Sequence, residues 1–127
     1  MSDAFDADVL ISAIDHDPRG DPCRRALAES RDRIGSVVLL PEVLTKPVRL
    51  GVENELKLLT EILATFDLKP VDEETADASV ALGAKYRLKA PDAIHLATAV
   101  VWGAERFYTR NTKDFGPHIT EIDVVAP

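Results

Sequence analysis

The segment from Ala90 to Ala99 reads Ala-Pro-Asp-Ala-Ile-His-Leu-Ala-Thr-Ala, and the segment from Phe107 to Phe115 reads Phe-Tyr-Thr-Arg-Asn-Thr-Lys-Asp-Phe. In the first, Asp92 opens an apolar helix. In the second, a short strand ends in a polar cluster. The carboxyl ends of strands and the N-termini of helices converge on one edge of an open α/β sheet, and ligands bind there. Together the two segments predict an α/β fold with a site at that edge.

Two upstream segments bring further acids to comparable positions. Asp6 and Asp8 follow a short apolar run at the N-terminus, and Glu42 follows the strand-like run from Ile34 to Leu40. Single acids at the ends of separate elements indicate a carboxylate cluster. Hard divalent cations prefer carboxylate oxygens as ligands, so the cluster predicts a site for Mg²⁺ or Mn²⁺.

Strand-like and helix-like segments alternate along the whole sequence. We predict strands at 4–7, 34–40, 68–71, 107–109 and 122–125, and helices at 9–14, 23–31, from 41 onward, 53–66, 73–88 and 91–102. The continuous apolar run at 34–40 is typical of a parallel strand that is covered on both faces. Pro70 places the strand at 68–71 near an edge of the sheet. We therefore expect a single domain over residues 1–127, a three-layer α/β/α fold with a mainly parallel central sheet.

The acidic segments together resemble the PIN domain and, within that family, the VapC-type toxin ribonucleases. The resemblance extends from about Ala4 to Val125. It rests on four motifs, which are Asp6-Ala7-Asp8-Val9, Glu42 in Pro-Glu-Val-Leu, Asp92 in Asp-Ala-Ile-His-Leu-Ala-Thr-Ala, and Thr109-Arg110-Asn111 with Asp114. The sequence departs from the family pattern at Asp8, where Asn or Ser is more usual, and at Asn111, where Asp is frequent.

The resemblance implies the toxin of a type II toxin–antitoxin system, an endoribonuclease that uses Mg²⁺ or Mn²⁺ to hydrolyse RNA phosphodiester bonds. It implies a catalytic set of Asp6, Glu42, Asp92 and Asp114, with metal ligation by Asp6, Asp92 and Asp114. The expected auxiliary residues are Asn111 and Thr109. The basic residues expected to meet RNA phosphates are Arg110, Lys113, Lys46 and Arg49. The implied partners are the RNA substrate, a VapB-like antitoxin and a second copy of the chain in a homodimer.

Several site residues also have simpler interpretations. Asp8 is the better N-cap candidate for a helix that starts at Val9. Glu42 and Asp92 are acids of the kind that the helix dipole favours in the first turn of any helix. His95, one turn after Asp92, is interpreted as a packed helix residue, with a place in the site as the alternative. The sequence leaves open whether Asn111 or Asp114 fills the fourth acid position.

Two other functions compete with a ribonuclease. A PIN-fold binding module with decayed catalysis is the first, because Asn111 stands at a position that is often Asp. A haloacid-dehalogenase-type phosphatase is the second, because Asp6-Ala7-Asp8 is similar to the nucleophile and acid pair of that family. Leu10 stands where that family has Thr or Val, and 127 residues is short for its fold.

Bulk composition sets further limits. The net charge of −7 argues against a nucleic-acid partner, because phosphate binding normally requires a basic surface. It predicts weak non-specific RNA affinity, with selectivity resting on a few local basic residues. No apolar run approaches the roughly 18 residues of a membrane span. Cys23 is the only cysteine, so no intramolecular disulfide can form and a cytoplasmic location without membrane association is expected.

Overall fold

Five strands alternate with helices along the chain, and the computed structural model describes every residue from Met1 to Pro127. The strands are β1 (Ser2–Phe5), β2 (Asp32–Ser36), β3 (Asp67–Lys69), β4 (Arg106–Tyr108) and β5 (Asp123–Val125). The α-helices are α1 (Ala7–Ala13), α2 (Asp21–Glu29), α3 (Leu39–Leu50), α4 (Glu53–Leu63), α5 (Glu73–Tyr86) and α6 (Ala90–Val101), and a 3-10 turn, Pro18–Gly20, precedes α2.

All four strand pairings are parallel, in the order β3-β2-β1-β4-β5, which confirms the predicted parallel sheet. Ala4 of β1 pairs with Ile34 of β2 on one side and with Phe107 of β4 on the other. The chain first builds outward from β1 to β3 and then returns to place β4 on the free side of β1. The order therefore switches between β1 and β4, and the crevice at the carboxyl ends of such a strand pair is where open α/β sheets bind ligands.

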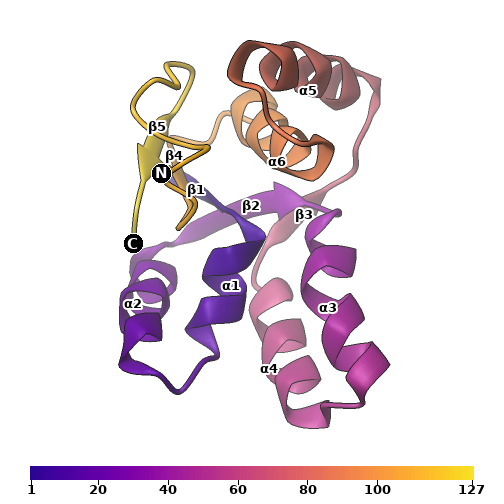
Figure 1. Cartoon of the computed structure of the whole chain (residues 1–127), viewed down its shortest axis with the longest axis vertical. Coiled ribbons are helices and arrows are strands. Elements are labelled where there is room, and N and C mark those ends of the chain that lie inside the picture. The colour runs from indigo at the N-terminus through magenta and orange to yellow at the C-terminus, as the bar shows by residue number, and fades with distance from the viewer.

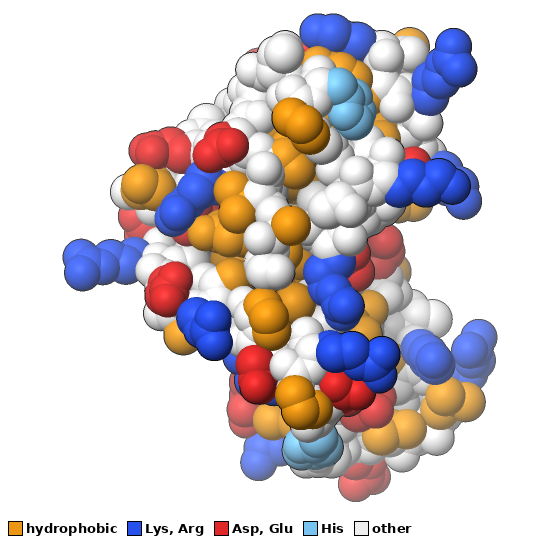
Figure 2. Space-filling view, turned by 60° about the vertical axis from the view of Figure 1, so that its left-hand side comes forward, with side chains coloured by type: hydrophobic (Ala, Val, Ile, Leu, Met, Phe, Trp, Pro, Cys, Tyr) orange, Lys and Arg blue, Asp and Glu red, His pale blue; other side chains and the backbone are white.

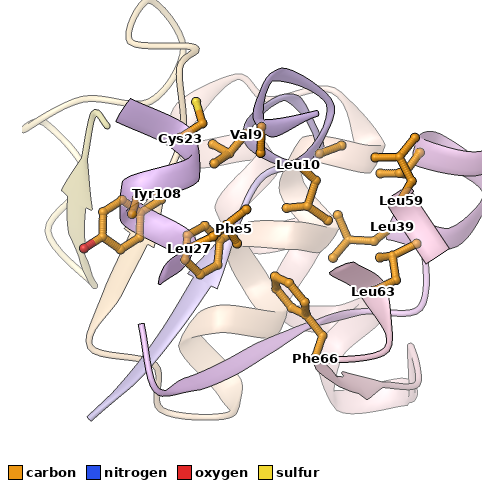
Figure 3. Packing of buried hydrophobic residues seen from close by; sticks show 14 residues of the cluster. Phe5, Val9, Leu10, Cys23, Leu27, Leu39, Leu59, Leu63, Phe66 and Tyr108 are labelled. Atoms are coloured by element: carbon orange, nitrogen blue, oxygen red, sulfur yellow. The ribbon is translucent and has the colours of Figure 1, made fainter. Parts of the chain in front are cut away.

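Helices cover both faces of the sheet, which confirms the three-layer architecture: α1 to α4 lie on one face, and α5 and α6 lie on the other (Figure 1). Successive side chains of β1 point to opposite faces. Phe5 stacks on Tyr108 at 4.9 Å between ring centroids and packs edge-on against Phe66, in the core shown in Figure 3. Ala4 belongs to the second core, beneath α6. No helix in the chain has the length and apolar character that crossing a membrane requires.

The second strand is shorter than the sequence predicted. β2 ends at Ser36, the next two residues form a turn, and α3 begins at Leu39, before Pro41. Leu39 is fully buried, so the apolar run is explained by the buried start of a helix as well as by a strand, and periodicity alone does not separate the two. Pro41 is tolerated because the first-turn N–H groups of a helix have no intrahelical partner. Glu42 stays in the first turn, as predicted.

Candidate active site

Asp6 lies at the switch point, where β1 ends and α1 begins. Its backbone N–H donates to the Tyr108 carbonyl at 2.9 Å, which joins β1 to β4 at this point. Its Oδ1 accepts from the Ala7 N–H at 2.9 Å, and Asp6 is the N-cap of α1. The prediction that Asp8 caps this helix was therefore wrong. The helix starts two residues earlier than the apolar pattern indicated, and Asp8 lies in its first turn.

The polar cluster after β4 occupies the other oxygen of Asp6. Thr109 Oγ1 donates to Asp6 Oδ2 at 3.0 Å and accepts from the Asn111 N–H at 3.0 Å. Asn111 Nδ2 donates in turn to Asp114 Oδ2 at 3.0 Å, and the Asp114 N–H donates to Asn111 Oδ1 at 3.3 Å. Thr109 is fully buried, whereas Asp114 is exposed. A chain of hydrogen bonds therefore connects a buried acid at the end of β1 to a surface acid on the loop after β4.

Glu42 approaches from α3 and is held by α6. Its Oε1 is hydrogen-bonded to Nε2 of His95, a ring that is 3% exposed. His95 is a packed helix residue, as the sequence indicated, but this contact with Glu42 was missed. The available signal was the three-residue spacing from Asp92, which places both side chains on one helix face. Nothing in the sequence pattern identified Glu42 as the partner.

Asp92 lies where the carboxylates meet. Burial raises its pKa, and the charges of Glu42, Asp114 and Asp8 act in the same direction. His95 opposes them and lowers the pKa. The structure thus brings acids from α1, α3, α6 and the loop after β4 to one place.

Burial is also the first cause of the raised pKa values in α1. It raises the pKa of Asp6, with Asp92 adding to the effect and His95 and Thr109 opposing it. For Asp8, burial and the charge of Asp6 together raise the pKa to about 6. The raised pKa values show that nearby positive charges and hydrogen bonds do not fully compensate the negative charges of Asp6 and Asp8.

Of the four basic residues predicted to meet phosphates, only Arg110 contacts a site acid. Its N–H donates to Asp8 Oδ1 at 3.4 Å, and its guanidinium donates to Ser12. Lys46 lines the same groove as Glu42. The remaining two, Lys113 and Arg49, are exposed and form no ion pair.

The groove next to Glu42 runs between α1 and the α3–α4 pair and has a volume of about 550 Å³. Its apolar lining includes Ile11, Ile14, Leu50 and Leu58. A second cavity of about 510 Å³ shares Ile14 and Leu58 with it, so the two cavities adjoin each other.

The donor chemistry of the site suits a hard divalent cation. The acids supply carboxylate oxygens alone, and a bound cation would relieve the repulsion that raises their pKa values. In this structure no three His, Cys, Asp or Glu side chains lie close enough together to hold one ion. The residues therefore fit a cation by chemistry, and ligation would require side-chain rotation.

Replacing Asp8 by Asn should stabilise the metal-free protein at pH 7 but not at pH 4. The folded-state pKa of about 6 lies above the 3.8 of an unperturbed aspartate, so ionisation of Asp8 opposes folding. This cost is absent below about pH 4, where the carboxyl is protonated in both states, and is complete well above pH 6. With solvent screening we expect a gain of about 1 kcal/mol at pH 7, or several degrees in Tm.

Melting curves of both proteins in EDTA at the two pH values measure this gain. Asp77→Asn, on the exposed surface of α5, makes the same charge change and should give no pH-dependent gain. A parent protein as stable as Asp8→Asn at pH 7 would show that ionisation of Asp8 does not destabilise the folded protein.

Comparison with known proteins agrees with this geometry. The PIN domain family model matches residues 4–116. A chain of a toxin–antitoxin complex from Klebsiella pneumoniae is 31% identical, with 94% of this chain and 98% of that chain covered and a TM-score of 0.76. No match was found among curated proteins.

Two more distant structures share the fold. One is the DNA-bound VapBC from Salmonella typhimurium, with 19% identity, coverage of 99% and 98%, and a TM-score of 0.78. The other is Mycobacterium tuberculosis VapC20, described as a sarcin–ricin loop cleaving toxin, with 14% identity, coverage of 95% and 98%, and a TM-score of 0.74. The chain therefore belongs to the PIN domain family, and the likeness to VapC-type toxins that its motifs indicated is confirmed at the level of the fold.

Proposed function

We propose that this protein is the VapC-type toxin of a type II toxin–antitoxin system and hydrolyses RNA phosphodiester bonds with the help of Mg²⁺ or Mn²⁺. The observation that carries the proposal is the meeting of carboxylates around Asp92 at the switch point of a PIN domain. PIN domains are nucleases, and the relative at 31% identity is part of a toxin–antitoxin complex. We propose that residues 1–127 act as a single domain in the cytoplasm.

Each acid has a proposed role in the reaction. Asp6, Asp92 and Asp114 would hold the cation, which when bound lowers the pKa of a water molecule and stabilises negative charge on the phosphodiester. Glu42 would orient the attacking water from α3. Thr109 and the Ala7 N–H each occupy one oxygen of Asp6, at 3.0 and 2.9 Å, and each oxygen keeps a further lone pair for a cation. Asn111 would act through Asp114, to which its amide donates at 3.0 Å.

RNA recognition has to overcome the charge of the chain. Figure 2 shows one face of the molecule, on which basic side chains are spread among acidic ones. We propose that binding rests on local contacts from Arg110, Lys113, Lys46 and Arg49, with Arg110 closest to the acids. Such a surface supports low non-specific affinity and a strong dependence on the particular RNA. Catalytic decay stays the alternative, because Asn111 replaces a frequent Asp.

The groove lined by Glu42 suits a VapB-like antitoxin. Ile11 and Leu50 on its walls are 46% and 58% exposed, so an amphipathic helix or extended segment would cover them. Glu42 is among the residues that line the groove, so a basic side chain of the antitoxin would reach it there. Such a contact would exclude RNA or metal and relieve the carboxylate repulsion. We also propose a homodimer, which the family resemblance implies.

Replacing Asp92 by Asn should abolish most of the activity and leave the fold intact. The change keeps the shape of the side chain but removes a charge from the centre of the cluster, so the cleavage rate should fall by about 100-fold or more while Tm is unchanged or higher. Cleavage of a mixed RNA pool in Mg²⁺, Mn²⁺ or EDTA measures this. Asp77→Asn is the matched control. Near-parent activity of Asp92→Asn would disprove the assignment.

The contributions of Asn111 and Asp114 can be separated by metal binding. A carboxylate gains more from Mn²⁺ than an amide oxygen does, so Asp114→Ala should weaken Mn²⁺ binding more than Asn111→Ala if Asp114 is the fourth acid. Isothermal titration of Mn²⁺ into both variants measures which substitution weakens metal binding more. If Asn111→Ala has the larger effect, Asn111 holds the family's acid position, and Asn111→Asp should raise both affinity and rate. Equal affinities in the two variants would leave a three-acid site of Asp6, Glu42 and Asp92.

Expression of the chain alone should arrest growth of a bacterial host, and co-expression of the small gene next to its own should restore growth. Charged groove variants, Ile11→Glu and Leu50→Glu, should keep RNA cleavage but escape the antitoxin, because a buried charge in the apolar interface is costly. Val80→Glu, at a 72% exposed position of α5, is the control that should stay inhibited. A harmless parent chain that is monomeric at micromolar concentration would contradict the toxin assignment. Groove variants that the antitoxin still inhibits would contradict the proposed docking site.

A further inference from the structure

We propose that His95 is a positioning residue for the active site: it fixes the carboxylate of Glu42, the only site acid that comes from α3, so that it faces the acids of α1 and α6. The inference rests on the proposed function, because it concerns the same cluster. The sequence offered a place in the site for His95 only as the alternative to simple packing, and the inference gives this residue a defined role.

Glu42 needs such a partner. Its side chain is 31% exposed at the start of a helix, where a glutamate ordinarily samples several rotamers in water. Asp6, by contrast, is held through both oxygens by Ala7 and Thr109. The single hydrogen bond that the structure gives the Glu42 carboxylate is the one to His95 Nε2. No other hydrogen bond or ion pair in the structure holds the Glu42 side chain.

His95 is suited to this role by its burial. The ring is 3% exposed, and a buried ring nitrogen that loses its hydrogen-bond partner destabilises the folded protein. The ring therefore holds Glu42 from a fixed position on α6. The ring also lies close enough to Asp6 and Asp92 to lower the pKa of both. One imidazole thus touches or neighbours three of the four proposed acids.

Thr98, one turn further along α6, shows what a purely structural polar residue looks like on this helix. It is 1% exposed, and its hydroxyl donates to the carbonyl of Ile94 in the same helix at 2.8 Å. His95 instead reaches across to a residue 53 positions away in sequence. The contact of His95 joins two elements of the site, whereas that of Thr98 joins none.

The kinetic test compares three variants in the full-length protein. His95→Leu keeps the bulk of the ring without its hydrogen bond, and it should lower kcat by about tenfold or more, because misplaced catalytic groups cost rate even when substrate still binds. KM should change little. His95→Gln places an amide near the position of Nε2 and should recover part of the lost kcat. Thr98→Val is the matched control and should keep the parent kcat.

Two kinetic results would overturn the proposal. One is a parent-like kcat in His95→Leu. The other is an equal loss in His95→Leu and Thr98→Val with equal loss of thermal stability, which would show only a disturbed core.

A second measurement needs neither RNA cleavage nor a histidine variant. The chain has three histidines, so its imidazole nitrogens can be followed in a ¹⁵N spectrum of the metal-free protein. Glu42→Ala, a change at the surface, should shift the Nε2 signal of His95 and leave His16 and His118 unchanged. An unshifted His95 signal would overturn the proposal. If the parent protein cleaves no RNA but the signal shifts, the ribonuclease function fails while the coupling of His95 to Glu42 stands.

Discussion

Repulsion between carboxylates is the constraint on which the rest of this structure depends. Burial of Asp92 raises its pKa, and the neighbouring charges of Glu42, Asp114 and Asp8 raise that pKa further. A protein does not gather such groups without a compensating interaction, because a buried unpaired charge opposes folding. Other interactions of the fold therefore have to supply the stability that holds these carboxylates together. The site itself still has a demand for positive charge.

The architecture meets part of this demand before any ion binds. Asp6 is the N-cap of α1, and Glu42 and Asp92 lie in the first turns of α3 and α6. The N-terminus of a helix carries a partial positive charge, which favours an acid by about 0.3–1 kcal/mol. Three helices thus begin at the same cluster. The parallel sheet explains this for α1 and α3, because β1 and β2 end at the same edge and these two helices follow them there, whereas α6 follows α5.

The hydrogen bonds of the site divide its acids into fixed and movable ones. Asp6 is buried and held by Ala7 and Thr109, whereas Asp114 is exposed and linked to the rest only through Asn111. This division is consistent with the absence of three converging ligands in the structure. A fixed acid at the switch point and a movable acid on a loop would allow the site to close around a cation. The hydrogen bond from His95 would make Glu42 a fixed acid, like Asp6.

The sequence predicted the sheet, the layers and the acid-bearing elements, because these follow from alternating apolar segments and from where strands end. It predicted the end of β2 poorly, since Val37 to Leu40 form a turn and the start of a helix rather than a strand, and only Leu39 of this run is fully buried. It named Asp8 as the helix cap because two neighbouring acids are equivalent in a pattern, and only the strand end at Phe5 distinguishes them. The contact between His95 and Glu42 joins distant segments, and no local pattern carries that information.

The central claim is that these carboxylates hold a divalent cation, and anomalous diffraction from crystals grown with Mn²⁺ tests it most directly. A single strong anomalous peak should lie about 2.1–2.2 Å from carboxylate oxygens of Asp6 and Asp92, with a further oxygen from Asp114 or Asn111. The same crystals soaked in EDTA should lose the peak. A fully formed site without any peak at millimolar Mn²⁺, or a peak away from Asp6 and Asp92, would contradict the account.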